Sequence, residues 1–379
     1  MSRVVLGDVA IEHKESCKVN RGMYPTVGLE HMRSEEITLT KWDNGGDSSF
    51  TKMFRKGNVL FGRRRAYLKK AVIAPFDGIC SGDIIVIEAI PNRILPELLP
   101  LVIQNDALFD YAVSKSAGSL SPRVKWEHLK EYEFELPDLD KQRKLAEVLW
   151  AINDAVESYK KLLDATDKLV KARFEEMFGG NALVDLNYPV IQMDEVFNIS
   201  SSKRILKSEW RDSGIPFLRV RDMVRLAMNQ PADNDFFVSD ELYASLCESD
   251  GIPQAGDIMV SATSTIGKCY EVKPGERFYY KDADILRFRK KIDIDSTFFM
   301  YCMKLPVLMN QIEATLGVTT VSHFLIARAK TLKVPMPPME QQQKFAAFVH
   351  QTDKSKSELE QALSELTATY KRILSENLG

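Results

Sequence analysis

The sequence predicts an α+β fold in which one module, a globular domain followed by a long helix, occurs twice. Residues 136–146 (LPDLDKQRKLA) recur as residues 336–346 (MPPMEQQQKFA). Each copy runs into a long stretch without proline or internal glycine, whereas the chain before each copy mixes strand-like and short helical patterns. We therefore expect a pseudo-twofold internal repeat with these parts: residues 1–136, 137–180, 181–336 and 337–379.

The two globular domains are expected to be mixed β-sheets with helices. Shorter helical patterns occupy residues 95–113 and 296–316. The repeat continues faintly into the domains, because residues 56–60 (KGNVL) align with residues 255–259 (AGDIM). Short apolar runs bounded by turn residues predict strands at residues 58–61, 83–87, 257–260 and 285–288.

The long stretches predict two helices that form an antiparallel coiled coil. Apolar residues recur at alternating spacings of four and three, which indicates a coiled-coil seam rather than a helix lying on a sheet. Antiparallel pairing would relate the two modules by a pseudo-twofold axis. Thr166 and Lys356 interrupt the seam, either to set its register or to receive a partner's helices; a two-helix linker without a partner is the simpler alternative. The residues expected to pair the helices or dock a partner are Leu145, Leu149, Ile152, Val156, Tyr159, Leu163, Val170, Phe345, Val349, Leu359, Leu363, Leu366, Tyr370 and Ile373.

The composition limits the class of protein. The 379 residues exceed one ordinary core, and 45% of them are hydrophobic and 27% charged. We find no run of 18 apolar residues and no secretory leader, so we expect a cytoplasmic protein that does not enter a membrane. The five cysteines form no C-x-x-C pair, which favours reduced thiols.

The net charge of −2 hides a local excess of positive charge. Between Lys52 and Lys70 the chain carries eight basic residues and no acidic one. Arginine fits guanine O6 and N7, and lysine neutralises phosphates, so this stretch predicts DNA contact; a solvated basic surface is the alternative. Residues 117–125 add hydroxyls and cations that suit phosphates, unless the hydroxyls cap a helix. The DNA-binding candidates of the first domain are Arg63, Arg64, Arg65, Tyr67, Lys69, Lys70, Ser121, Arg123 and Lys125.

The second domain has fewer clustered cations. Residues 263–268 occupy the position equivalent to the arginine-rich loop, and residues 317–323 share the hydroxyl-rich character of residues 117–125. The alternation of Arg219 and Arg221 predicts that both side chains lie on one face of a strand. The DNA-binding candidates of this domain are Lys203, Arg204, Lys207, Arg219, Arg221, Thr263, Ser264, Thr265, Lys268, Thr319 and Thr320.

The motifs of catalysis are absent from the sequence. Residues 262–269 approach a P-loop but lack its first glycine and its final hydroxyl. The five histidines show no metal-ligand spacing. Cys80 has no identifiable base, so a buried structural cysteine is expected. We therefore expect a non-enzymatic protein that holds no cofactor or metal and whose partner supplies the chemistry.

The segment of proline, acid and glutamine before each heptad helix, in two copies about 200 residues apart, resembles the specificity subunit of type I restriction-modification enzymes. The resemblance covers essentially the whole chain. The first copy departs from the common Glu-Gln form, because it has residues 140–142 (DKQ) where the second has residues 340–342 (EQQ).

The resemblance implies two target-recognition domains that each read one half of a bipartite sequence in double-stranded DNA. It implies that the paired helices set the length of the unread spacer and dock two DNA methyltransferase subunits, with motor-nuclease restriction subunits as a further addition. Two alternatives stay open. A coiled-coil scaffold with protein-binding ends would explain the helices but not the basic stretch, and the specificity subunit of a type II-like methylase-nuclease would share the architecture.

Overall fold

The computed structural model describes residues 2–18, 20–46, 48–179, 188–248, 251–315 and 323–378. The chain separates into two compact units. The first unit comprises Met1–Leu163 with Glu358–Gly379, and the second comprises Asp164–Ser357. Both units combine sheets with helices, and the predicted α+β class with a duplicated module is confirmed.

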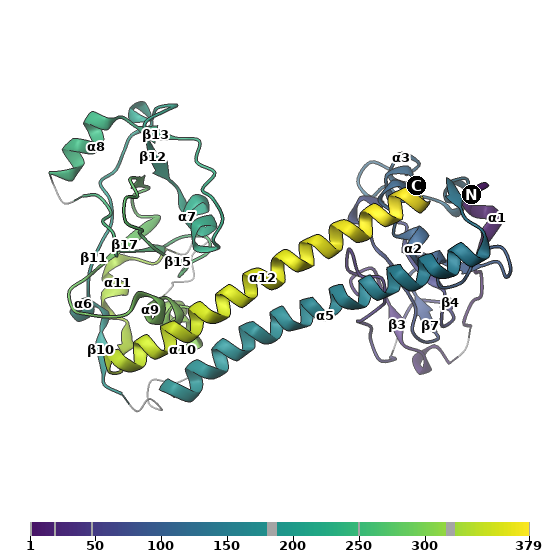
Figure 1. The fold of residues 1–379 in the computed structure, drawn as a ribbon, viewed down its shortest axis with the longest axis horizontal. Helices are drawn as coiled ribbons and strands as arrows, with labels where there is room; N and C mark the ends of the chain where they lie inside the picture. Colours follow the sequence, from purple (N-terminus) through teal and green to yellow (C-terminus); the bar gives the residue numbers. More distant parts are fainter. Residues whose placement is uncertain are drawn as a thin grey trace. The chain divides into compact units, whose positions relative to one another are not determined.

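The first domain, drawn in purple to blue in Figure 1, is organised around a sheet with the strand order β2-β8-β5-β6, whose neighbours all pair antiparallel. Every residue of β5 and the first four residues of β8 are buried. Strands buried on both faces read as continuous apolar runs, which is why these two were recognisable in the sequence. A second sheet has the order β3-β7-β4, and β1 pairs with β9. The strands are β1 (Ser2–Val5), β2 (Ala10–Glu12), β3 (Thr26–Val27), β4 (Lys52–Phe54), β5 (Val59–Gly62), β6 (Ala71–Ile73), β7 (Gly78–Cys80), β8 (Ile84–Ala89) and β9 (Glu133–Leu136).

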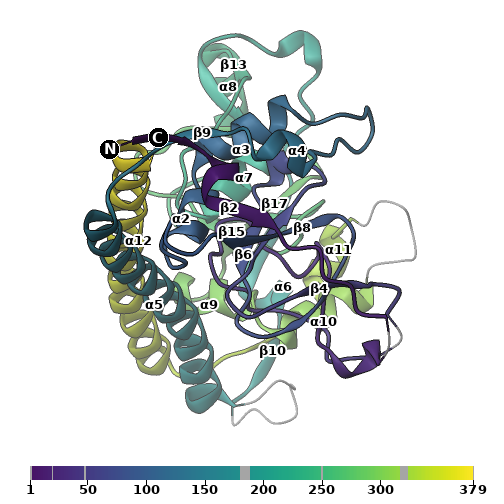
Figure 2. The same ribbon diagram turned by 90° about the vertical axis from the view of Figure 1, so that its right-hand side faces the viewer.

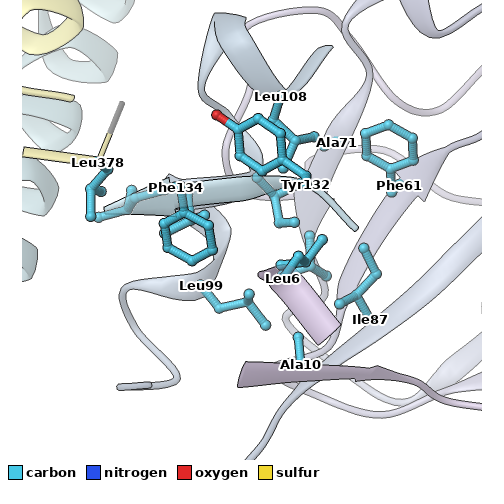
Figure 3. Close-up of a cluster of buried hydrophobic side chains, with 14 of the residues drawn as sticks. Leu6, Ala10, Phe61, Ala71, Ile87, Leu99, Leu108, Tyr132, Phe134 and Leu378 are labelled. Carbon is cyan, nitrogen blue, oxygen red and sulfur yellow. The ribbon is translucent and has the colours of Figure 1, made fainter. Parts of the chain in front are cut away.

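Short helices complete the core of the first unit. The Asn105 side chain accepts a hydrogen bond from the Ala107 amide at 3.0 Å and so caps the beginning of α3 (Asp106–Ser114). Its amide nitrogen also donates to the carbonyl of Leu378 at 3.1 Å. Leu378 lies in the same hydrophobic cluster as Phe61 and Phe134, which Figure 3 shows in close-up. The helices of this domain are α1 (Leu6–Val9), η1 (Arg21–Met23), η2 (Ala66–Leu68), α2 (Leu99–Ile103), α3 (Asp106–Ser114) and α4 (Trp126–Leu129).

The second domain repeats the main sheet with the strand order β11-β17-β14-β15, and β10 pairs with β18 as β1 does with β9. Its strands are β10 (Val190–Gln192), β11 (Phe197–Ser200), β12 (Ile215–Leu218), β13 (Phe237–Val238), β14 (Ile258–Ser261), β15 (Cys269–Glu271), β16 (Tyr279–Tyr280), β17 (Ile285–Lys290) and β18 (Lys333–Pro335). Its helices are α6 (Met193–Val196), η4 (Lys207–Glu209), α7 (Val220–Ala227), α8 (Asp240–Cys247), α9 (Ser296–Cys302), α10 (Pro306–Thr315) and α11 (Ile326–Thr331).

The two domains differ in their three-stranded sheets, which have the order β3-β7-β4 in the first domain and β13-β12-β16 in the second. Both retain one parallel pair, β3 with β7 and β12 with β16. In the first domain the additional strand β4 pairs with β7, whereas in the second domain β13 pairs with β12. The duplicated frame therefore comprises the main sheet and the terminal strand pair, and the remaining segments have diverged.

The long helices are α5 (Leu139–Phe178) and α12 (Met339–Leu378). In the first unit the beginning of α5 contributes Leu149 to a core shared with Leu374 and Leu378 near the end of α12. In the second unit the end of α5 contributes Phe174 to a core shared with Phe345 near the beginning of α12. The helices therefore pair antiparallel, as Figures 1 and 2 show. None of the described helices is both long and apolar enough to cross a membrane.

The glutamine of each repeated segment is buried at the start of its helix. The Gln142 side-chain oxygen accepts a hydrogen bond from the Leu95 amide, and its nitrogen donates to the Pro137 carbonyl, both at 2.9 Å. Gln342 repeats this arrangement: its side-chain oxygen accepts from the Asp295 amide at 2.9 Å, and its nitrogen donates to the Pro337 carbonyl. A neutral amide can both accept and donate at such a place, whereas a carboxylate can only accept. The glutamine that marks the repeat in the sequence thus connects each helix to its domain.

Candidate nucleic-acid interface

The arginine-rich segment of the first domain is the loop between β5 and β6, residues 63–70, which we name loop A. The Arg63 amide donates to the Asp83 carbonyl, and the Arg63 carbonyl accepts from the Val124 amide, both at 3.0 Å. The Arg65 amide donates to the Pro122 carbonyl at 2.8 Å. Backbone hydrogen bonds therefore bring loop A together with residues 117–125, the two segments that the sequence singled out for DNA contact.

Asp83 organises the base of loop A. Its carboxylate accepts two hydrogen bonds from Arg123, at 2.7 and 3.2 Å, and lies 3.6 Å from the Arg64 guanidinium. The hydrogen bond from Arg123 is the main cause that lowers the pKa of Asp83. Arg64 also donates to the Ser121 hydroxyl at 3.3 Å, and Arg63 donates to the Val124 carbonyl at 3.2 Å. These arginines and Ser121 are engaged within the domain.

The lysines of loop A are engaged as well. Lys69 lies 2.5 Å from the Asp106 carboxylate, and this hydrogen bond is the main cause that raises the pKa of Lys69. Lys70 donates to the Leu29 carbonyl at 2.7 Å. Lys69 also lines a cavity of about 480 Å³ within the first unit, together with Phe109, Val156, Leu363, Tyr370 and Leu374.

Arg65 and Tyr67 are the exposed residues of loop A among those predicted to bind DNA. Tyr67 is 54% exposed. The Arg65 guanidinium makes no hydrogen bond or ion pair with any residue that the structure describes, and Lys125 in the adjoining segment is exposed in the same way. The predicted cluster of positive charge thus reduces to a few side chains that are free to meet a ligand.

Sequence reasoning missed two features of this surface. Asp83 was not recognised, because its partners Arg64 and Arg123 are distant in the sequence and only the fold unites them. Leu120 was also missed, although it is 89% exposed. The signal for Leu120 was an apolar residue enclosed by serines, glycine and proline in residues 118–122, a composition typical of an exposed turn.

The loop between β14 and β15, residues 262–268, is the counterpart of loop A, and we name it loop B. The Ala262 amide donates to the Asp284 carbonyl at 2.8 Å, and its carbonyl accepts from the Phe324 amide at 2.9 Å. These bonds repeat those of Arg63 with Asp83 and Val124. The predicted equivalence of residues 263–268 with the arginine-rich loop is therefore confirmed at the level of individual hydrogen bonds.

Loop B presents a different chemistry on this frame. The Ser261 hydroxyl donates to the Thr265 carbonyl at 2.5 Å and accepts from the Lys268 amide at 2.9 Å, which holds the loop in place. Ser264 and Thr265 are exposed, whereas Thr263 is 7% exposed. The loop therefore offers small hydroxyl side chains where loop A offers an arginine and a tyrosine.

Cations of the second domain lie in residues 200–207. Ser201 accepts from the Ala283 amide at 3.0 Å, which ties this segment to the turn that also holds loop B. Lys203, Arg204 and Lys207 are exposed, and none of their side chains forms an ion pair with the part of the chain that the structure describes. They are the exposed cations of this segment, whereas Lys268 in loop B is half-buried.

The prediction for Arg219 and Arg221 was wrong about their secondary structure. Strand β12 ends at Leu218, Arg219 is the N-cap of α7, and Arg221 lies within that helix. The Arg219 amide donates to the Asp222 carboxylate at 2.9 Å, which starts the helix at this point. Both guanidinium groups contact Asp235, at 3.0 and 2.5 Å. A capping carboxylate thus overrode the alternating pattern.

The remaining candidates have varied positions. Thr319 and Thr320 lie outside the described residues. Cys80 is buried, and its burial raises the pKa of its thiol to about 12. Among the described residues, no group of three or more His, Cys, Asp or Glu side chains could hold a metal ion.

Comparison with known families accounts for the duplicated frame. A model of the type I restriction modification DNA specificity domain matches residues 5–165 and again residues 186–367. The chain belongs to this family. Each matched range contains one of the two loops and much of one long helix, so the internal repeat is a repeat of the specificity domain.

Similar proteins agree with this assignment. A Haemophilus influenzae protein described as a type I restriction enzyme specificity subunit is 27% identical over 169 residues, 44% of this chain and 40% of that protein. The MjaIX specificity subunit of Methanocaldococcus jannaschii is 23% identical over 278 residues, 68% of this chain and 62% of that protein. The chain thus spans about half the length of these two relatives.

One solved structure, reported on the structural basis of complex assembly and conformational transition of the type I R-M system, contains a chain with the fold of this protein. The match has a TM-score of 0.60 at 19% identity, and covers 99% of this chain and 97% of that one. This chain and the matched chain therefore share one fold over nearly their whole length.

Proposed function

We propose that this specificity subunit reads a bipartite sequence in double-stranded DNA, with one domain for each half-site. In this proposal α5 and α12 set the length of the spacer and dock two DNA methyltransferase subunits, to which motor-nuclease restriction subunits can be added. The chain itself supplies recognition, and its partners supply the chemistry.

The observation that carries this proposal is the relation between loops A and B. Equivalent backbone hydrogen bonds hold the first residue of each loop, Arg63 and Ala262, while the side chains that the loops expose differ in charge and size. A recognition protein with two different half-sites needs this combination, because a constant frame positions loops whose side chains specify the bases. A scaffold that binds two copies of one partner would gain nothing from such divergence.

The free cations support contact with DNA rather than with a neutral surface. The exposed cations are Arg65 and Lys125 in the first domain and Lys203 and Arg204 in the second, and Tyr67 is exposed beside Arg65. Exposed lysines and arginines neutralise phosphates, and an arginine fork or a hydroxyl can bond a base edge. The engaged residues Arg63, Arg64, Lys69, Lys70 and Arg123 would act by shaping loop A.

Docking of methyltransferases on the helices is supported by an apolar face of α5 that the first unit leaves open. Val148 is 48% exposed and Leu162 is 52% exposed. They lie two heptads apart and therefore share one face of the helix. The predicted seam residues Ile152, Val156 and Tyr159 are half-buried instead. We assign the seam to helix pairing and the Val148 face to the methyltransferase.

The proposal is tested by expressing the chain with the DNA methyltransferase encoded beside it and sequencing single DNA molecules for N6-methyladenine. A bipartite motif with a fixed spacer, lost when this gene is deleted, is the expected result. An active methyltransferase that produces no gene-dependent motif would contradict the proposal and favour the scaffold. A motif without any motor-nuclease partner in the purified complex would identify the type II-like arrangement.

A further inference from the structure

Loops A and B each contain, at their third residue, an unusual backbone conformation. Arg65 has a φ of 54° and Ser264 a φ of 58°, in the left-handed region that side chains disfavour. Each is the third residue after its strand, because β5 ends at Gly62 and β14 ends at Ser261. The two residues therefore occupy equivalent positions of the repeated frame.

Glycine is the residue that this conformation normally selects. The turn before each of the same strands follows this rule, since Gly57 and Gly256 have φ values of 89° and 85°. Both copies of the module have kept glycine in that turn, yet neither has glycine at the loop tip. A side chain that persists in a strained conformation points to a function for the side chain.

The surroundings of Arg65 and Ser264 fit such a function. The Arg65 backbone is held by its bond to the Pro122 carbonyl, while the guanidinium is exposed and unpaired among the described residues. The neighbours Arg63 and Arg64 are exposed less and bond within the domain. Ser264 is exposed too, in a loop whose ends are fastened by Ser261. Each loop thus combines a fixed backbone with an exposed polar side chain at its residue of positive φ.

We propose that Arg65 and Ser264 are equivalent specificity-determining residues, one for each half-site. Arg65 donates from its fork to guanine O6 and N7 in the major groove, and the Ser264 hydroxyl bonds a base edge in the other half-site. The left-handed backbone directs each side chain out of its domain. This assignment rests on the proposed function, because it requires that the loops face DNA.

Glycine substitution separates recognition from structure. Arg65→Gly and Ser264→Gly remove the side chain and also relieve the backbone, so both variants should have an unchanged or higher melting temperature. If the side chains read bases, Arg65→Gly relaxes the methylated motif at one position of one half-site, and Ser264→Gly does so in the other half-site. Affinity for the cognate duplex should fall roughly 5- to 150-fold, the range of a lost base contact.

Two further variants sharpen the experiment. Asn92 also has a positive φ, 64°, and lies outside both loops; Asn92→Gly should leave the motif unchanged. Arg65→Lys keeps the charge but loses the fork, and should relax the motif while the salt dependence of binding stays the same. If Arg65→Gly folds poorly, Arg65→Asn takes its place, since asparagine tolerates the left-handed region.

The outcomes distinguish this inference from the function on which it rests. If the unmodified chain directs a bipartite motif and both glycine variants direct the same motif with the same affinity, Arg65 and Ser264 do not determine specificity, although the proposed function stands. If the unmodified chain directs no motif, the proposed function itself fails. Relaxation confined to a different half-site for each variant would establish the assignment.

Discussion

In the first domain, loop A places Arg65 and Tyr67 at the surface and uses Asp83 to hold Arg64 and Arg123 beneath them. In the second domain, the backbone of Asp284 and Phe324 holds Ala262 of loop B as the backbone of Asp83 and Val124 holds Arg63. Loop B nevertheless exposes serine and threonine, and the Asp284 carboxylate has no partner among the described residues. Backbone contacts and buried amides therefore preserve the module, whereas the exposed side chains are free to diverge.

The largest effect is expected where the long helices enter the cores, and it should differ between the two copies. Phe345 is fully buried and contacts Phe174 and Phe178, whereas its counterpart Leu145 is only half-buried. Phe345→Ala should destabilise the second unit by about 3–5 kcal/mol, and Leu145→Ala should cost the first unit less. Denaturant unfolding followed by hydrogen exchange would assign each loss to its unit. Equal losses would contradict the difference in burial.

Substitution of the buried glutamines Gln142 and Gln342 should instead destabilise the two units by nearly equal amounts. Gln142→Leu leaves the Leu95 amide and the Pro137 carbonyl without partners, and Gln342→Leu does the same in the second unit. Each change should cost about 2–3 kcal/mol, because buried polar groups would lose their hydrogen bonds. Faster exchange of the Leu95 amide in the first variant alone, and of the Asp295 amide in the second alone, would be the measurement.

A matched control for the glutamines is Gln343→Leu. Gln343 is exposed, so its substitution should change stability by less than about 0.5 kcal/mol. A loss at Gln343 as large as that at Gln342 would mean that the amide bonds are not the cause.

The loops should differ in the salt dependence of DNA binding. Changing Arg63, Arg64 and Arg65 together to alanine should weaken binding and reduce the slope of log K against log salt by about 0.9, because one exposed positive charge leaves the interface. Of the three, Arg65 is the one whose guanidinium has no partner among the described residues. Changing residues 263–265 together to alanine removes no charge and should leave the slope as it was. A reduction near three times that size would show that the charges of Arg63 and Arg64 act on the DNA as well. An unchanged slope in the arginine variant would remove loop A from the interface.

The smallest effect is expected from the two aspartates beside the loops, and it depends on pH. Arg123 lowers the pKa of Asp83 in the folded state. The resulting stability is small because solvent screens the pair; it is fully present above the unfolded pKa of about 3.9 and is lost as the pH falls through the lower folded pKa. Thermal unfolding of Asp83→Asn should therefore differ from the unmodified chain between pH 5 and 8 and converge with it in acid. Asp284→Asn is the matched control and should change the melting temperature less, because no ion-pair partner for the Asp284 carboxylate lies in the part of the chain that the structure describes.

The duplication, the two long helices and the two central strands of each main sheet, β5 with β8 and β14 with β17, were predictable from the sequence. A repeated segment and a heptad pattern are local signals, and strands buried on both faces appear as uninterrupted apolar runs. The position of loop B was also predictable, since it follows a strand that aligns with the one before loop A. The prediction for Arg219 and Arg221 was wrong, because the nearby Asp222 caps a helix that an alternating pattern cannot reveal.

The sequence by itself determined that this chain is two copies of one module, each with a long helix, and that positive charge gathers near loop A. Only the tertiary structure decided which of those charges are free. Asp83, Asp106 and Ser121 lie far along the chain from loop A, and folding brings them against Arg64, Lys69 and Arg123. An ion pair depends on distance in space, which the spacing of residues along the chain does not give. Arg65 and Ser264 could therefore be selected only from the fold.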